Sequence, residues 1–280
     1  MLSGLDRLRA TTTILQRARV IEPVRGMWEA ADVQWWHGRL RATDDLSLPV
    51  WYDDHGPVAA AGLTSSGDTW QVDVFTTLSR VSEEEIWGAA LTTASQHHDG
   101  ALELLVHQTD TNMIDLALDS GFTLTDDLSG TTWMDADHRP RVEQVDGFTV
   151  VDRATFQENP HPMVARNGSR IESRLRECSL YDSTLDLAVH DEQGLIAGYA
   201  LFWFDPTTLV GLLEPMRVEE DFQRRGLARA LLTNGLDRLA NKGARRLKVG
   251  FAASGARALY VGAGFVQTSV DRLLLRDIPG

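Results

Sequence analysis

The sequence predicts a mixed α/β protein made of two domains in tandem. Three observations lead to this fold class: strand-like and helix-like hydrophobic patterns alternate, a polar segment near the middle interrupts both patterns, and the same ending occurs twice. The polar segment, residues 135–147, contains a proline and is typical of a boundary. We therefore expect a domain at 1–136, a linker at 137–147 and a second domain at 148–280.

Hydrophobic periodicity predicts an alternation of helices and strands in the first half. A capping box, Ser82 with Glu85, marks the start of one of these helices. In chain order we expect a helix over the first 20 residues, a packed helix within 27–40, a strand at 69–76, a helix at 83–97, a strand at 101–108, a helix ending at 116–122 and a strand near 131–137.

The second half predicts a longer alternation of the same kind. A hairpin turn at Glu192-Gln193-Gly194 separates two of its strands. In chain order we expect a strand at 148–152, a helix at 161–179, strands at 185–191, 195–205 and 209–218, a helix at 226–241, a strand at 245–251, a helix at 255–263 and a strand at 265–276.

Both halves end with a strand, a short helix, a Gly-Phe pair and a strand. The pairs are Gly121-Phe122 and Gly264-Phe265, which lie 143 residues apart. A pattern that recurs in this order indicates an internal duplication.

Composition limits the class of protein and its partners. The hydrophobic fraction of 43% and the charged fraction of 24% are typical of a soluble globular protein. No run of about 20 apolar residues occurs, which predicts no membrane span. The N-terminus is interrupted by charges and does not resemble a signal peptide. The single cysteine, Cys178, excludes an intramolecular disulfide and fits a reducing compartment, so we expect a cytoplasmic protein.

The negative charge lies in the first half. Residues 1–140 contain 9 Arg, no Lys and 22 Asp or Glu, whereas residues 141–280 contain 18 Lys or Arg and 18 Asp or Glu. This distribution argues against nucleic acid as a partner. It also favours the second half as the place where a multiply charged anion binds.

The hexapeptide Gln223-Arg224-Arg225-Gly226-Leu227-Ala228 predicts an anion-binding turn. Helix N-termini present unpaired N–H groups and the positive end of the helix dipole. Gly226 lets a phosphate approach the backbone, Ala228 keeps the first helical turn open, and two arginines add positive charge. The alternative is an ordinary helix start with two solvated arginines.

This turn resembles the acetyl-CoA signature of the GNAT superfamily of N-acetyltransferases, Gln/Arg-x-x-Gly-x-Gly/Ala. The segment ARALYVGAGF, 256–265, resembles that family's Leu-Tyr-x-x-x-Gly-Phe segment. The resemblance covers 147–280 by motif and 45–135 by topology. It implies two GNAT-like domains, each with a mixed, mostly antiparallel sheet flanked by helices. Tandem members with a degenerate first copy exist, the mycothiol synthase type among them, and this sequence is similar to one.

The resemblance implies acetyl-CoA as co-substrate, a primary amine as acceptor and no metal. Pro215 would mark a strand bulge at which the pantetheine arm enters, with Glu214 beside it as general base and Tyr260 as general acid for the departing thiolate. Ala253 stands where the family often has Asn, which weakens any predicted side-chain contact from that loop. The implied cofactor-binding residues are Met216, Arg217, Val218, Gln223, Arg224, Arg225, Gly226, Leu227, Ala228, Arg229 and Ser254.

The first half lacks the anion-binding turn and the tyrosine, and we expect it to be catalytically silent. Three glutamates, Glu83, Glu84 and Glu85, open its helix and disfavour a second acyl-CoA there, and Ala117 takes the place that matches Tyr260. Trp28, Trp35 and Trp36 are expected to pack between helices, with a role in shaping the acceptor pocket as the alternative.

Several alternatives stay open at this stage. The histidines have no matching Cys or carboxylate spacing, which predicts no metal site. His161, between two prolines, predicts a loop residue, with acceptor contact as the alternative. A non-catalytic acyl-CoA-binding, sensing or interaction module is the rival function. We expect a small-molecule acceptor, although a protein N-terminus is not excluded. The choice between a monomer and a homodimer is open.

Overall fold

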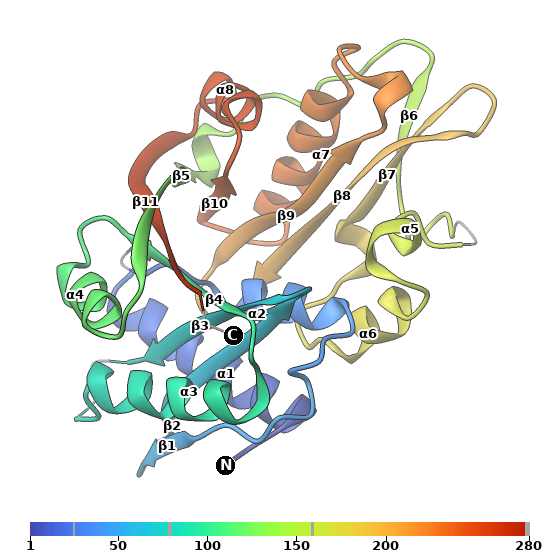
Figure 1. Ribbon diagram of the computed structural model, residues 1–280. Coiled ribbons are helices and arrows are strands. Elements are labelled where there is room, and N and C mark those ends of the chain that lie inside the picture. Colours follow the sequence, from blue (N-terminus) through green and yellow to red (C-terminus); the bar gives the residue numbers. More distant parts are fainter. Residues whose placement is uncertain (25, 78–79, 158–159, 278–280) are drawn as a thin grey trace. The chain divides into compact units, whose positions relative to one another are not determined.

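The computed structural model describes residues 1–24, 26–77, 80–157 and 160–277. Contacts between residues divide the chain into two compact units (Figure 1). Unit 1 consists of Met1–Ser129 and Ser269–Gly280, and unit 2 consists of Gly130–Thr268.

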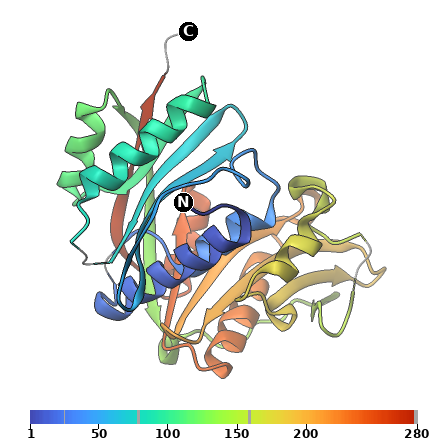
Figure 2. The ribbon, with the colours of Figure 1, turned by 90° about the horizontal axis from the view of Figure 1, so that it is seen from below.

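Unit 1 has a mixed sheet with helices on both sides. Its strand order is β1-β2-β3-β4-β11-β5. Strands β3 and β4 are parallel, and the pairs β1-β2, β2-β3 and β4-β11 are antiparallel. Figure 2 shows α1 and α3 on opposite sides of β2 and β3, and both helices contact these two strands. The elements are α1 Gly4–Ile21, α2 Ala30–Gly38, β1 Val50–Asp53, β2 Gly56–Ser66, β3 Thr69–Thr76, α3 Glu83–His97, β4 Ala101–His107, α4 Thr111–Asp119 and β5 Thr123–Asp135.

Unit 2 repeats this plan. Its strand order is β6-β7-β8-β9-β10-β5, with β9 and β10 parallel and the other pairs antiparallel. Each unit therefore has the mixed, mostly antiparallel sheet that was predicted. The elements are η1 Ala136–His138, β6 Phe148–Asp152, α5 Val164–Asn167, α6 Ile171–Glu177, η2 Ser183–Leu185, β7 Asp186–Asp191, β8 Ile196–Asp205, β9 Val210–Val218, η3 Glu220–Phe222, α7 Leu227–Asn241, β10 Arg246–Phe251, α8 Ser254–Gly262 and β11 Val266–Arg276.

Most predicted elements agree with the structure, and three regions differ. The strand expected near 131–137 is β5, which begins eight residues earlier, at Thr123. The helix expected at 161–179 is divided into α5 and α6, because Gly168 at φ 87° ends α5. Strands β1 and β2 were not identified from the sequence. Six consecutive residues of β2, from Val58 to Leu63, are buried, so its small apolar residues show no alternation.

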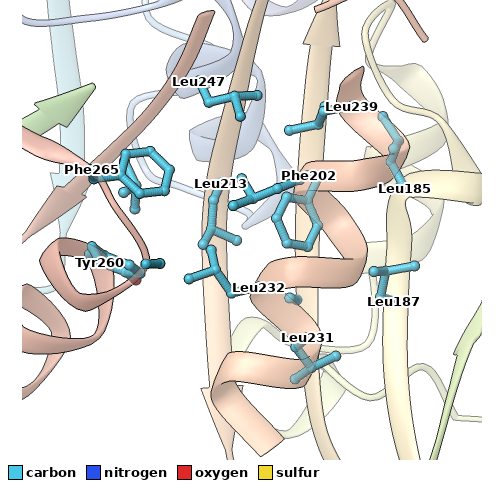
Figure 3. Close-up of a cluster of buried hydrophobic side chains, with 14 of the residues drawn as sticks. Leu185, Leu187, Phe202, Leu213, Leu231, Leu232, Leu239, Leu247, Tyr260 and Phe265 are labelled. Atoms are coloured by element: carbon cyan, nitrogen blue, oxygen red, sulfur yellow. The ribbon is translucent and has the colours of Figure 1, made fainter. Parts of the chain in front are cut away.

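A leucine-rich face of α7 forms the core of unit 2. Leu231, Leu232 and Leu239 pack with Phe202 of β8 and Leu213 of β9 (Figure 3). Each of these side chains is at most 4% exposed, and burying one such side chain contributes roughly 1.5–3 kcal/mol. Gly235 lies on the same face and leaves room for the Phe202 ring.

The two endings of the internal repeat have the same structure. Gly121 and Gly264 take positive φ angles of 85° and 104°, which end α4 and α8. The next backbone N–H then donates to the helix, from Phe122 to the Ala117 carbonyl at 3.0 Å and from Phe265 to the Tyr260 carbonyl at 3.1 Å. Ala117 and Tyr260 therefore occupy equivalent helical positions.

Both boundaries between the units fall inside a strand. The second part of β5, Gly130–Asp135, pairs with β10 in unit 2, and Asp271–Arg276 of β11 pairs with β4 in unit 1. The boundaries of the two compact units therefore do not fall in the predicted linker at 137–147. The division of the chain into domains at that linker stays a prediction. Within unit 2, residues 139–147 are irregular and bound to α7, for example through Arg139 and Asp237 at 2.9 Å.

Within the described ranges, no helix combines the length and the apolar character needed to cross a membrane.

We predict that Gly235→Ala lowers the free energy of unfolding by about 1–3 kcal/mol. A Cβ atom at this position would lie 2.0 Å from Cζ of the buried Phe202 ring. The measurement is denaturant unfolding. Gly88→Ala, within α3, is the matched control, because its Cβ would meet nothing within 4 Å. This control should gain up to about 1 kcal/mol from helix propensity. Equal changes in both variants would contradict the prediction.

Candidate functional site

The site is built on strand β9, which parts from β10. On one side β9 pairs with β8 from Val210 to Val218. On the other side it pairs in parallel with β10 only over Val210–Leu212 and Arg246–Lys248. For the described residues, β9 beyond Leu212 has no pairing partner on β10. The second half of β9 therefore lies between one bonded neighbour and one that has turned away.

A bulge interrupts β9 where the two strands part. Met216 pairs with Ala200 and Leu213 with Phe202, so Glu214 and Pro215 together face a single residue of β8. Proline has no N–H with which to continue a ladder. This register confirms the bulge that was expected at Pro215. The Trp203 indole Nε1 donates to the Glu214 carbonyl oxygen at 2.8 Å, which fixes the bulged backbone.

The turn after β9 presents open backbone N–H groups at the start of α7. Gly226 caps this 15-residue helix at φ 85°, in the left-handed region that glycine tolerates. In the part of the chain that the structure describes, the N–H groups of Gly226, Leu227 and Ala228 have no hydrogen-bond acceptor. These groups and the helix dipole favour a bound anion.

The arginines of this segment have two different surroundings. Arg224 and Arg225 are exposed beside the turn, and Arg225 lies over the Phe222 ring at 5.5 Å and donates to the Asp221 carbonyl at 3.1 Å. Arg229 instead donates to the Glu143 carboxylate at 2.5 Å and to the Gly262 carbonyl at 3.1 Å. It therefore ties residues 139–147 and the end of α8 to α7.

The other predicted cofactor-binding residues are spread around the turn. Met216, Arg217 and Val218 are half-buried on the second half of β9. The Gln223 side chain donates to the Val218 carbonyl at 3.3 Å and thereby closes the turn onto β9. Ser254 is exposed at the first residue of α8.

Tyr260 of α8 is buried at the edge of the core, with 7% of its surface exposed. Its ring lies against that of Phe265 at 6.2 Å between centroids (Figure 3). Burial raises the pKa of Tyr260 to about 12, and the negative charge of Glu214 adds to this shift. The phenol therefore keeps its proton at neutral pH. The two predicted catalytic side chains lie within electrostatic range of each other.

His161 is a buried, hydrogen-bonded loop residue. Its side chain is fully buried, with Nε2 at 3.0 Å from the Asp186 carboxylate. The backbone N–H of Met163 donates to Nδ1 at 3.2 Å, and the Tyr181 hydroxyl donates to the same carboxylate at 2.9 Å. These contacts account for His161 as a loop anchor instead of an acceptor-binding residue.

Sequence reasoning missed two residues that support the site. Trp203 holds the bulge, and its only sequence signal is that it is the one tryptophan after residue 140. Glu143 pairs with Arg229 across 86 residues and has no local signal. Within the described residues, no group of three or more His, Cys, Asp or Glu side chains is arranged to hold a metal ion.

Residues 151–265 match the acetyltransferase (GNAT) family. This segment runs from β6 to the Gly-Phe pair after α8, and it contains the bulge, the Gly226 turn and Tyr260. The match covers this segment and not the rest of the chain. No curated protein sequence matches the chain.

Solved structures extend this likeness to both units. The tandem GNAT protein from the clavulanic acid biosynthesis pathway is 14% identical with a TM-score of 0.68, over 99% of this chain and 97% of that one. The GCN5-related N-acetyltransferase from Sphaerobacter thermophilus is 17% identical with a TM-score of 0.62, over 99% and 94%. The GNAT-family acetyltransferase from Colwellia psychrerythraea is 13% identical with a TM-score of 0.59, over 96% and 97%. At these identities the likeness shows the fold, and it includes a tandem GNAT protein.

We predict that Arg229→Met lowers the free energy of unfolding by about 1 kcal/mol, because two hydrogen bonds are lost from a partly exposed side chain. Arg224→Met is the matched control, since this exposed guanidinium has no partner among the described residues. Denaturant unfolding compares the two variants. A loss of stability in Arg224→Met as large as that in Arg229→Met would refute the different roles assigned to them.

Proposed function

We propose that this protein is an acetyl-CoA-dependent N-acetyltransferase whose activity lies in unit 2, with the primary amine of a small molecule as acceptor. The observation that carries the proposal is the sequence of features along β9. The strand parts from β10, bulges at Glu214 and Pro215, and ends in the Gly226 turn. The same segment matches the GNAT family.

Acetyl-CoA would bind along this strand. The open N–H groups of Gly226, Leu227 and Ala228 would donate hydrogen bonds to the pyrophosphate oxygens, with Arg224 and Arg225 adding positive charge. Backbone groups of Met216, Arg217 and Val218 would bond the pantetheine amides, because this part of β9 has no β10 partner. We assign to Gln223 and Arg229 the role of holding the Gly226 turn in place. Ser254, the first residue of α8, is assigned a contact with the coenzyme.

The acetyl group would pass directly to the amine. Glu214 would take the proton of the amine as it attacks the thioester carbonyl, so that a C–N bond forms and the C–S bond breaks. An ordinary thiol has a pKa of about 8.5. Because the pKa of Tyr260 is about 12, Tyr260 would serve mainly as a hydrogen-bond donor that stabilises the departing thiolate.

An acyl-enzyme on the cysteine is disfavoured. Cys178 is buried, and its Sγ lies 3.4 Å from the Arg174 carbonyl as a donor. Burial raises the pKa of this thiol to about 12, so little thiolate is present at neutral pH. Direct transfer needs no such nucleophile.

Unit 1 is proposed to be catalytically silent. Strands β2 and β3 pair without a register shift, so the described part of β3 has no counterpart of the bulge in β9. Helix α3 begins with three glutamates, and the Ser82 hydroxyl accepts the Glu85 N–H at 3.1 Å. Residues 78–79, which belong to the loop where a pyrophosphate turn would be expected, lie outside the described residues. The mycothiol synthase type, the cytoplasmic location and the oligomeric state stay predictions.

We predict that Gly226→Glu lowers acetyl-CoA affinity at least a hundredfold. The substitution forces a side chain into a left-handed backbone and places a negative charge beside the proposed pyrophosphate site. Calorimetric titration with acetyl-CoA gives both affinity and stoichiometry. Gly88→Glu, an open helical position in unit 1, is the matched control and should bind normally. Retained affinity in Gly226→Glu would exclude this turn as the coenzyme site.

We predict that Tyr260→Phe and Glu214→Gln each lower kcat about 100-fold or more and leave the Kd of acetyl-CoA within about threefold. Both changes keep the shape of the side chain, so coenzyme binding should persist. Glu214→Gln removes the group that takes the proton of the amine, and Tyr260→Phe removes the hydrogen-bond donor to the departing thiolate. CoA release is measured over a panel of primary amines. Parallel losses of kcat and affinity would indicate packing roles. Coenzyme binding by the parent protein with no CoA release on any amine would favour the rival, a non-catalytic acyl-CoA-binding module.

A further inference from the structure

Unit 1 contains a cavity of about 250 Å³ that has no role in the proposed acetyl transfer. It lies where β3 and β4 part, since their parallel pairing covers only Thr69–Gln71 and Ala101–Glu103. Residues of α1, β3, β4 and α4, together with 26–28, form its walls. Unit 1 therefore has a cavity at the place equivalent to the parted strands of unit 2.

A buried carboxyl group, that of Asp73, forms part of the wall. Asp73 is 2% exposed and lies on β3. The Trp28 indole donates to its Oδ1 at 2.9 Å, and the Gln71 amide nitrogen lies 3.0 and 2.9 Å from its two oxygens. A carboxylate offers about four acceptor positions, so these donors orient the group and leave acceptor capacity.

The charged groups around the cavity favour a positively charged ligand. Glu22, Glu83 and Asp110 also line it. The two basic side chains on the wall are already paired. Arg19 donates through Nε to Glu29 at 2.9 Å, and His107 lies 2.5 Å from Asp271. Residues 1–140 contain 22 Asp or Glu against 9 Arg and no Lys, so phosphates would meet an unfavourable field here.

The rest of the wall is apolar. Apolar side chains from four elements contribute to it, and such surface takes up the body of a ligand in preference to water. A volume of about 250 Å³ accommodates a molecule the size of a single substituted ring. The apolar lining residues used here are Leu15, Phe75, Leu104, Val106 and Met113.

We propose that this cavity binds a small organic cation, with its ammonium group at Asp73 and its apolar body against the aliphatic and aromatic wall. A buried carboxylate held by two donors supplies a charge-assisted hydrogen bond, and the apolar wall supplies hydrophobic contact. The site is distinct from the proposed acetyl-transfer site, which lies in unit 2. Its occupant differs in chemistry from an acyl-CoA, which carries phosphates.

The ionisation of Asp73 is consistent with this role. Burial raises the pKa of Asp73 to about 7, and the negative charges of Glu103 and Asp32 contribute. A bound cation would stabilise the carboxylate, so affinity should increase as the pH rises from 6 to 8. The charged groups on the surrounding elements are Asp32, Glu103, the Arg19–Glu29 pair, the His107–Asp271 pair, Glu22, Glu83 and Asp110.

The test compares three probes of similar shape and different charge: benzylammonium, benzyl alcohol and benzoate. The readout is the indole N–H resonance of Trp28 in a ¹H–¹⁵N spectrum at pH 8, assigned by its loss in Trp28→Phe. We expect benzylammonium to shift this signal saturably, benzyl alcohol to bind at least about tenfold more weakly, and benzoate to leave it unchanged. Because the Trp28 indole donates to the Asp73 carboxyl, its resonance reports directly on this cavity of unit 1.

Three variants complete the test. Asp73→Asn should weaken benzylammonium at least about tenfold, whereas Asp119→Asn, an exposed residue outside the cavity, should bind like the parent. Ala18→Leu, which fills the cavity from α1, should block the probe even if Asp73→Asn fails to fold. The proposal is overturned if the Trp28 signal does not respond, if it responds equally to all three probes, or if benzylammonium binds undiminished to folded Asp73→Asn or Ala18→Leu.

Discussion

The arrangement of unit 2 depends on how the backbone of β9 is bonded. A sheet normally satisfies each strand from both sides. Here β8 holds β9 along its length, while β10 holds it only up to Leu212. The bulge at Glu214 and Pro215 and the Gly226 turn both lie beyond this point. Beyond Leu212, the described part of β9 pairs with β8 on one side and has no β10 partner on the other. Such a strand offers fixed backbone donors and acceptors to an extended ligand, which is why the proposed coenzyme site follows it.

The same scaffold has opposite electrostatics in the two units. Both contain a short parallel strand pair that parts, with a helix between its two strands in the chain. In unit 2 the following helix begins with open N–H groups and two arginines, and in unit 1 it begins with three glutamates. A buried tyrosine stands at the end of one repeat, and alanine stands at the equivalent position of the other. If both proposed sites exist, substitutions at helix starts and strand centres account for the difference between a site for an anion and a site for a cation.

Local patterns predicted most of the fold and the elements that carry the candidate site. Periodicity identified α7 and β9, and the glycine turn together with the Gly-Phe pair located the elements around Tyr260. Features that depend on distant partners escaped prediction. The alternation rule fails for β2 because it is buried on both faces. The partner of Arg229 is 86 residues away, so the sequence assigned this arginine to the coenzyme and gave no sign of its bond to Glu143.

Strands β5 and β11 each have residues in both units, and this has a consequence for biosynthesis and for evolution. Unit 1 lacks the strand beside β4 until Asp271–Arg276 has left the ribosome, although its other strands are synthesised long before. Proteolysis at 137–147 would therefore not release an intact first half. A gene that lost its second copy would also lose a strand of the first. Unit 2 in turn takes Gly130–Asp135 of β5, which follows the first repeat, as the partner of β10. Each copy therefore completes the sheet of the other, which is a reason for both to be retained whatever chemistry each performs.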